Sequence, residues 1–336
     1  MIGTPGSRAE ALSPASLAGA AILLEIGAEY DVIDALRGGA PVDPQEAARR
    51  TGIPAVVMRQ YLKALVTVGL AETVRDDGQQ PHFRETPLLG QLVHDVGFLS
   101  WGLRACEPLI AHAREFATAM VQAQSLHPRD GGLVARTSRW MGEKAFYPQA
   151  ERTMLALRPT RVVDFGSGSG QLLIKLLKQL PGATAVGIDI NSGACEQARA
   201  AGAASGVSDR LTIFERPIQS LVHDPEPLQG ADVIHAGWVF HDLLPTEESA
   251  LDEILAVCCR TASTGTLVIV EGVPYATEAG EALFSAAYTF LHESFMGRRL
   301  LTEAAWRKKL ESAGFTRIEV EQLGIPGGRL FAANAR

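Results

Sequence analysis

Two histidines and an aspartate in the second half of the sequence could together hold a metal ion. His241 and Asp242 are adjacent, and His292 lies in the run from Tyr288 to Glu293. Two imidazoles and one carboxylate can bind one face of a metal and leave positions open for a chelating substrate. No local spacing enforces such a site, because the two histidines lie far apart in the chain. Taken by itself, His292 could equally be a core or surface histidine.

His241 and Asp242 stand out through their position rather than their residue types. The same dipeptide begins at His94 and at His223, and neither of those copies follows a buried strand. His241 instead comes shortly after an apolar strand predicted at residues 232–237. Because ligands bind at the strand ends of open α/β sheets, we expect both side chains to face a ligand pocket.

The element that must position this pocket is a strand that runs into a glycine-rich turn at residues 166–170. Val162 and Val163 are apolar and β-branched, as in a buried strand, and leucines at helical spacing follow the turn. A second apolar strand ends at Asp189. Glycines let the backbone turn sharply and let a ligand approach closely. A nucleotide-like ligand would lie across this turn, with its ribose hydroxyls on Asp189.

The glycine spacing discriminates between families of nucleotide-binding domains. The dinucleotide fingerprint GxGxxG fails because Gln171 stands in place of its third glycine, and the pattern found is DxGxGxG. In this the sequence resembles the class I methyltransferases that use S-adenosylmethionine; a flavodoxin-like or dehydrogenase domain is the alternative. In that family an acidic residue after the third strand usually binds adenine, and Pro217 and Ile218 occupy its place, which implies an apolar wall. The resemblance assigns S-adenosylmethionine binding to Asp164, Gly166, Ser167, Gly168, Gly170, Asp189, Ile190, Pro217 and Ile218.

Composition limits the classes of partner. The chain has 336 residues, of which 46% are hydrophobic, enough for a large core and about two domains. A net charge of −7 and a pI near 5.7 argue against a nucleic-acid partner. The sequence shows neither a long apolar span nor a secretion leader, so we expect no membrane contact and a cytoplasmic location. Its four cysteines have no CxxC spacing and predict neither disulfides nor a cysteine-bound metal.

Residues 1–95 are predicted to form a mainly helical domain of the winged-helix kind. Asp43 is a good cap for a helix that starts at Pro44, and Gly52 closes that helix. The predicted elements are a helical stretch at 16–36 interrupted near Gly27, helices at 44–52 and 54–68, and two short strands within 71–86 around the turn Asp76, Asp77, Gly78.

A winged helix can bind DNA, which is the alternative from another functional class. Its second helix, residues 54–68, offers only Arg59 and Lys63 for phosphate contacts, so burial of its apolar face against a partner subunit explains it better. The small-molecule O-methyltransferases carry such a domain for dimerisation, and the resemblance extends over almost the whole chain. It implies a homodimer without a nucleic-acid partner. A third possibility is a regulator or scaffold that retains only the cofactor fold.

The remaining chain is predicted to divide into two parts. Residues 96–150 form linking helices that roof the substrate, and residues 151–336 form the S-adenosylmethionine-binding domain. The fold class is α/β, with a Rossmann-like sheet that ends in an antiparallel hairpin. Its seven strands are expected at 161–165, 185–188, 211–214, 232–237, 266–270, 316–323 and 329–333.

The resemblance to O-methyltransferases implies one role for His241. The matching histidine of that family is a general base that removes a hydroxyl proton, and a later acidic residue holds its ring. At that later position this chain has Arg298, which would disfavour an imidazolium. If His241 acts as the base, Asp242 or Glu271 could orient it.

A second resemblance implies a different chemistry. His241 with Asp242 after the fourth strand, and His292 before the terminal helix, are similar to the metal-dependent 2-oxo-acid C-methyltransferases of β-methyl amino-acid and antibiotic biosynthesis. The resemblance implies that these three residues are catalytic ligands of iron, or of zinc, cobalt or nickel. The metal would stabilise the enolate of a 2-oxo acid, whose β-carbon attacks the sulfonium methyl group. The size of the substrate is left open. Residues expected to contact it are Trp101, Arg129, which would pair with its carboxylate, Trp238 and Met296.

Overall fold

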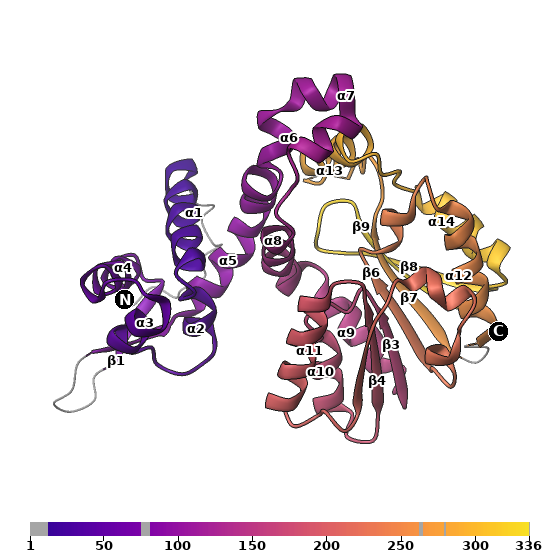
Figure 1. Cartoon of the computed structure of the whole chain (residues 1–336), viewed down its shortest axis with the longest axis horizontal. Coiled ribbons are helices and arrows are strands. Elements are labelled where there is room, and N and C mark those ends of the chain that lie inside the picture. Colours follow the sequence, from indigo (N-terminus) through magenta and orange to yellow (C-terminus); the bar gives the residue numbers. More distant parts are fainter. Residues whose placement is uncertain (1–12, 75–80, 262–264, 279, 336) are drawn as a thin grey trace, which may run out of the picture. The chain divides into compact units, whose positions relative to one another are not determined.

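The chain forms two compact units. The computed structural model describes residues 13–74, 81–261, 265–278 and 280–335 (Figure 1). One unit comprises Met1–Ala111 and Arg129–Gly142, and the other comprises His112–Pro128 and Glu143–Arg336. Residues 96–150, which we predicted as one linking segment, are therefore shared between the two units.

The first unit is mainly helical. As predicted, a helix begins at Pro44: the Asp43 carboxylate accepts from the Gln45 N–H at 2.8 Å, and Gly52 ends the helix with a φ of 74°. β1 and β2 pair antiparallel, while the predicted turn at 76–78 lies outside the described residues. The elements are α1 (Pro14–Glu29), α2 (Ile33–Arg37), α3 (Pro44–Thr51), α4 (Ala55–Thr67), β1 (Ala71–Val74), β2 (His82–Glu85), α5 (Pro87–Ser100), η1 (Trp101–Ala105), α6 (Glu107–Ala111) and most of α8 (Gly131–Ala145), whose last residues belong to the second unit.

The prediction that Gly27 interrupts the first helix was wrong. Gly27 lies inside α1, and the chain breaks only at residues 30–32. A Cβ on Gly27 would lie 1.9 Å from the Tyr61 hydroxyl oxygen. That hydroxyl donates to the Leu23 carbonyl at 2.9 Å. The glycine therefore provides space for a buried tyrosine from α4 rather than a break in the helix.

The second unit is built on a seven-stranded, mostly parallel sheet, which confirms the predicted fold class. The strand order is β5-β4-β3-β6-β7-β9-β8, and only β9 pairs antiparallel, with β7 and β8 (Figure 1). Its strands are β3 (Arg161–Phe165), β4 (Thr184–Asp189), β5 (Leu211–Glu215), β6 (Val233–Gly237), β7 (Thr266–Gly272), β8 (Arg317–Gln322) and β9 (Gly328–Asn334). The helices are α7 (Ala113–Leu126), α9 (Tyr147–Ala156), α10 (Gln171–Gln179), α11 (Ser192–Ala204), η2 (Ile218–Val222), η3 (Glu226–Leu228), η4 (Phe240–Leu243), α12 (Glu248–Thr261), α13 (Ala282–Phe290), η5 (Leu291–Phe295) and α14 (Glu303–Ala313).

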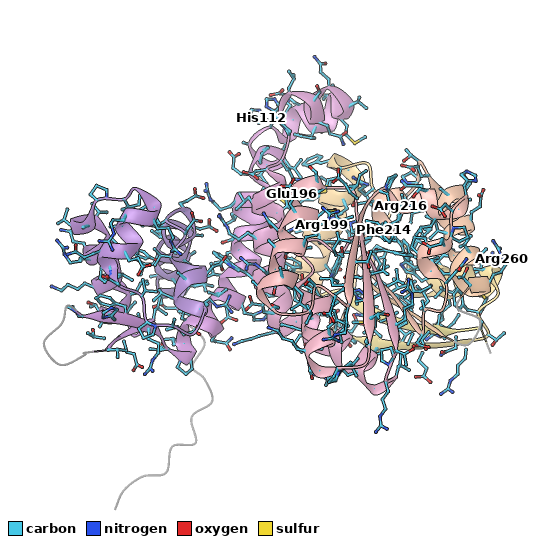
Figure 2. The ribbon with its side chains drawn as sticks, turned by 60° about the horizontal axis from the view of Figure 1, so that its bottom comes forward. His112, Glu196, Arg199, Phe214, Arg216 and Arg260 are labelled. Carbon is cyan, nitrogen blue, oxygen red and sulfur yellow. The ribbon has the colours of Figure 1, made fainter. Side chains whose placement is uncertain are left out.

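Buried apolar side chains of the parallel strands hold this sheet against its helices. Val163 and Phe165 of β3 and Ile234 of β6 are fully buried, as expected for a sheet covered on both faces. At the edge strand β5, Arg199 of α11, which is labelled in Figure 2, donates to the Ile213 carbonyl at 3.0 Å. In the described parts of the chain, no helix combines the length and apolar character needed to cross a bilayer.

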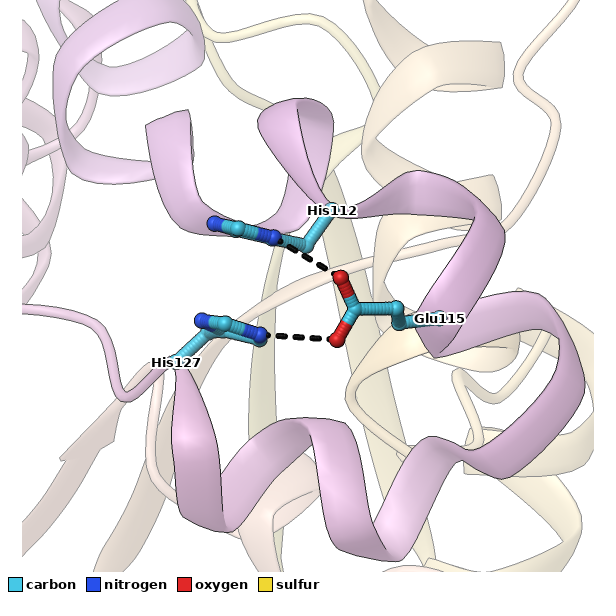
Figure 3. Close-up of side chains that lie close together, drawn as sticks. All are labelled: His112, Glu115 and His127. Atoms are coloured by element: carbon cyan, nitrogen blue, oxygen red, sulfur yellow. Dashed lines mark hydrogen bonds and ion pairs between the residues drawn. The ribbon is translucent and has the colours of Figure 1, made fainter.

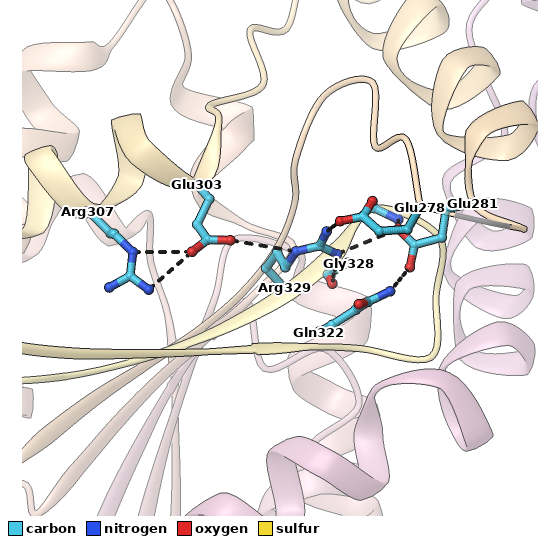
Figure 4. A network of polar contacts seen from close by, with 8 residues as sticks. Glu278, Glu281, Glu303, Arg307, Gln322, Gly328 and Arg329 are labelled. Carbon is cyan, nitrogen blue, oxygen red and sulfur yellow. Dashed lines mark hydrogen bonds and ion pairs between the residues drawn. The ribbon is translucent and has the colours of Figure 1, made fainter.

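A buried arginine joins three carboxylates at the start of β9. Arg329 is 6% exposed, and its guanidinium lies 2.8 Å from Glu278, 3.7 Å from Glu281 and 3.9 Å from Glu303 (Figure 4). Glu281 is also buried and accepts from the Gly327 N–H at 3.0 Å. One cation thus lies among three acids and reduces the repulsion between them.

Replacing Arg329 with methionine should lower the free energy of unfolding by about 3 kcal/mol, because the buried Glu281 would lose its cation. Urea denaturation of the full chain measures the loss. The matched control is Arg317→Met on β8, where the arginine side chain is 71% exposed beside Glu319 and should contribute less than about 1 kcal/mol. Equal losses in the two variants would contradict a structural role for the network.

Candidate active site

The glycine-rich turn joins β3 to α10 and has the backbone that its sequence predicts. Gly166, Gly168 and Gly170 have φ values of 65°, 53° and 72°, a backbone region that residues other than glycine rarely adopt. A Cβ on Gly166 would lie 2.4 Å from Val239 Cγ2, so that glycine is required by packing. At Gly168 a Cβ would have no heavy atom within 4 Å. The open side of the turn, at Gly168, is where a ligand can approach the backbone.

Asp189 lies at the end of β4, directly beside this turn. Its carboxylate accepts from the Gly168 N–H and from the Asn191 N–H, both at 2.8 Å. The neighbouring Ile190 side chain is 74% exposed, which is unusual for a large apolar residue. A carboxylate and an exposed apolar side chain therefore lie next to each other at the end of β4. Beyond β5, Pro217 is exposed and Ile218 is buried.

Two residues of the DxGxGxG motif point into the protein. The Ser167 side chain is buried, and its Oγ lies 2.5 Å from the position a Cβ would take on Gly187. Asp164 is 4% exposed, and the His235 Nδ1–H donates to its Oδ1 at 2.7 Å. His235 was not predicted as a site residue, because it lies within an apolar strand, β6. The buried side chains of Ser167 and Asp164 therefore pack on the protein side of the turn. A direct contact of either residue with the cofactor stays a prediction.

His241 forms a buried pair with Glu271. His241 lies in η4 just after β6, and Glu271 lies in the neighbouring strand β7 and has no exposed surface. The His241 Nδ1–H donates to Glu271 Oε2 at 2.8 Å, while the N–H groups of Phe240 and His241 donate to Oε1 at 2.8 Å and 3.2 Å. Of the two residues that could orient His241, the structure places Glu271 at Nδ1. The lone pair of His241 is then on Nε2.

Asp242 lies on the other side of the His241 ring. Its Oδ1 is 3.5 Å from His241 Nε2 and 3.1 Å from an Arg298 guanidinium nitrogen, which also donates to the Asp242 carbonyl. Arg298 therefore pairs with Asp242. Burial acts to lower the pKa of His241, but the charge and hydrogen bond of Glu271, together with Asp242, outweigh it and raise that pKa above its ordinary value.

His292 completes the predicted trio from a separate element. It lies in η5, is 5% exposed, and its Nδ1–H donates to the Tyr288 carbonyl at 2.8 Å. The rings of His241 and His292 lie 5.4 Å apart, centroid to centroid. The fold thus brings together η4 and η5, which are distant in sequence. The ligand atoms of His241, Asp242 and His292 do not all lie within 4.8 Å of one another, the spacing at which three residues could hold one metal ion. Among the described residues, only His112, Glu115 and His127 meet that spacing.

The predicted substrate residues are divided between the units. Trp238 has a φ of 58°, and its ring packs edge-on against His241 and Tyr288 at 6.5 Å and 6.0 Å. A positive φ on a tryptophan is uncommon and is held here by its surroundings. Met296 is half-buried just after η5. Trp101 and Arg129 belong to the other unit, where Arg129 lies beside Cys106; their contact with a substrate stays a prediction.

Comparisons with known proteins agree with this geometry. A family model described as a methyltransferase domain matches residues 163–262, the region from β3 to the end of α12. The release factor glutamine methyltransferase of Bradyrhizobium diazoefficiens is 32% identical over 90 residues, which cover 24% of this chain. That match covers 30% of the relative, and the chain spans about a third of the length of the curated relatives it matches.

Solved structures match nearly the whole chain. Human N-acetylserotonin methyltransferase, solved in complex with SAM, superposes with a TM-score of 0.58 at 17% identity. The match covers 98% of this chain and 100% of the human one. The mitomycin 7-O-methyltransferase MmcR superposes with a TM-score of 0.54 at 20% identity, covering 94% of each chain. The chain therefore has the class I S-adenosylmethionine-dependent methyltransferase fold, preceded by a mainly helical region.

Proposed function

We propose that the protein transfers the methyl group of S-adenosylmethionine to the β-carbon of a 2-oxo acid, assisted by a metal ion that His241, Asp242 and His292 bind. One observation carries the proposal. Both imidazoles donate Nδ1–H to an oxygen, of Glu271 and of Tyr288, at 2.8 Å in each case. Histidine ligands of metals almost always have such a partner on the other ring nitrogen, because it fixes the ring and its tautomer.

The residues around the glycine turn fit S-adenosylmethionine. Gly168 leaves open space where a side chain would stand, so the backbone can contact the ligand. The Asp189 carboxylate can accept from two ribose hydroxyls after giving up its contact with the Gly168 N–H. The exposed Ile190 offers an apolar face for adenine. These groups would hold the sulfonium methyl group near the ends of β3, β4 and β6.

The side chains of η4 and η5 fit a divalent or trivalent metal by their chemistry. Two neutral imidazoles and one carboxylate suit iron, zinc, cobalt or nickel. A bound ion would supply Lewis acidity to the carbonyl and carboxylate oxygens of a 2-oxo acid and so make its β-proton easier to remove. Glu271 orients His241, and the Tyr288 carbonyl orients His292. Trp238 packs beside His241 and is proposed to limit where the substrate can lie.

A second candidate function is O-methylation of a small molecule with His241 as general base. The hydrogen bond between His241 and Glu271 favours it, because a buried carboxylate that holds Nδ1 stabilises the imidazolium formed when Nε2 takes a proton. One structural neighbour, the mitomycin 7-O-methyltransferase, is named for the same reaction class. In this function His292 and Asp242 would have no direct part in catalysis.

Turnover with and without a chelator separates the two functions. The purified protein would be assayed with S-adenosylmethionine and a panel of aliphatic, aromatic and guanidino 2-oxo acids, and its metal content would be measured by mass spectrometry. The proposal predicts near-stoichiometric metal, methylation at carbon, and activity that is lost on chelation and restored by metal. Undiminished activity in metal-free protein would contradict it, and phenols and enols would then be the next substrates to test.

A further inference from the structure

His112, Glu115 and His127 form a compact cluster on the second unit (Figure 3). The Glu115 carboxylate lies 3.1 Å from His112 Nδ1 and 2.9 Å from His127 Nε2, with one oxygen facing each ring. The two rings stack at 3.5 Å with an angle of 5° between their planes. Their side chains are 37%, 52% and 22% exposed, in chain order, so solvent can reach them.

A sharp kink in α7 brings these residues together. His112 directly precedes α7, and His127 directly follows it. A straight helix of this length would separate its ends by about 20 Å. Ala119 instead has φ −149° and ψ 56°, and there the helix folds back on itself. The three side chains therefore close a hairpin of two short helical arms.

We propose that His112, Glu115 and His127 bind a divalent transition-metal cation such as Zn²⁺, at a site separate from the candidate ligands at the sheet ends. Two imidazoles and one carboxylate are Zn²⁺ ligands, and a water molecule can take the fourth position. Neighbouring donor atoms around tetrahedral Zn²⁺ are about 3.4 Å apart, given bonds of about 2.1 Å. The two histidine–carboxylate pairs of the cluster, at 3.1 Å and 2.9 Å, lie near that spacing, and one ligand atom from each of the three residues lies within 4.8 Å of the others.

The hairpin packs against the element that carries His292. Phe116 of α7 contacts Phe295 of η5, with ring centroids 5.6 Å apart. Gln124 donates to the Phe295 carbonyl at 3.1 Å, and Met120 lies 3.1 Å from the position that a Cβ would take on Gly297. A cation that joins both ends of α7 would hold this hairpin closed against η5. The site is therefore a structural clip for one wall of the candidate active site.

Zn²⁺ binding to the metal-depleted full chain tests this inference. Equilibrium dialysis would compare the wild type with His127→Gln, and with His223→Gln as the matched control at another exposed histidine. We expect the wild type and the control to bind one more Zn²⁺ per chain than His127→Gln, or to bind it at least about tenfold more tightly. Zn²⁺ should also slow amide hydrogen exchange across α7 in the wild type and leave it unchanged in His127→Gln.

The clip can be separated from the metal proposed for catalysis. His292→Ala, which removes a candidate ligand at the sheet ends, should keep the Zn²⁺ equivalent that His127→Gln loses. Identical Zn²⁺-binding curves for His127→Gln and His223→Gln would overturn the inference. The cluster would then be held only by the hydrogen bonds between its histidines and Glu115. That result would not bear on the proposed C-methylation, because the clip and the three candidate ligands share no residue.

Discussion

Replacing His292 with alanine should abolish methyl transfer to a 2-oxo acid and remove one metal equivalent, while the affinity for S-adenosylmethionine stays nearly unchanged. The expected loss of kcat/KM is at least about 100-fold, because removal of a ligand should cost more than the 10- to 100-fold typical of an outer hydrogen-bond partner. Cofactor affinity should hold because Asp189 and the glycine turn lie on other elements. Steady-state kinetics, metal analysis and calorimetric titration with the cofactor measure the three quantities.

The matched control is His223→Ala, which removes an exposed histidine outside the site. It should retain full activity and metal. A fully active His292→Ala enzyme would exclude His292 as a ligand. If His292→Ala contains no metal and still transfers the methyl group, the O-methylation alternative is favoured, in which only His241 accepts the substrate proton.

Glu271→Gln should lower kcat/KM by on the order of 10³-fold without unfolding the protein. The reason is the tautomer of His241. The amide oxygen can keep accepting from the N–H groups of Phe240 and His241, so the amide nitrogen faces His241 Nδ1. An N–H donor at that place forces the ring proton onto Nε2, where the lone pair is needed. Exchanging the orienting carboxylate for an amide in a serine-protease triad costs about 10⁴-fold for this reason.

The Glu271→Gln variant should bind S-adenosylmethionine normally, and its metal content distinguishes the two proposed functions. If His241 is a metal ligand, the bound metal per chain and kcat/KM should both decrease. If His241 is only a base, kcat/KM should decrease while the metal content stays unchanged. Glu319→Gln on β8 is the control, since that side chain is 63% exposed. Wild-type kinetics in Glu271→Gln would show that the hydrogen bond to His241 has no part in the reaction.

Local sequence signals predicted most of the second unit. Apolar β-branched runs located the seven strands, and a threonine, Thr302, precedes α14, where its hydroxyl accepts from the Ala305 N–H at 3.2 Å. The acidic end of β4 and the glycine turn were equally visible, because backbone requirements restrict residue types there. Strand patterns, helix caps and glycine turns are set by residues adjacent in the sequence, so the sequence alone is enough to predict them.

Pairings across the sheet were less predictable. Asp164 and His235 are direct partners on the adjacent strands β3 and β6, and only the register of those strands reveals that they meet. Glu271 was one of two options for orienting His241, since its position depends on how β7 lies beside η4. The cluster around Glu115 depends on one kink at Ala119, in a stretch that reads as a continuous helix.

The pairing of Arg298 with Asp242 has a consequence for how the protein is handled. Because a guanidinium already balances this carboxylate, an ion that arrives at Asp242 takes the place of a resident positive charge. If the proposed metal binds there, its uptake exchanges one counter-ion of Asp242 for another, and its removal leaves the carboxylate paired with Arg298. On that proposal, removing the metal should leave the protein folded.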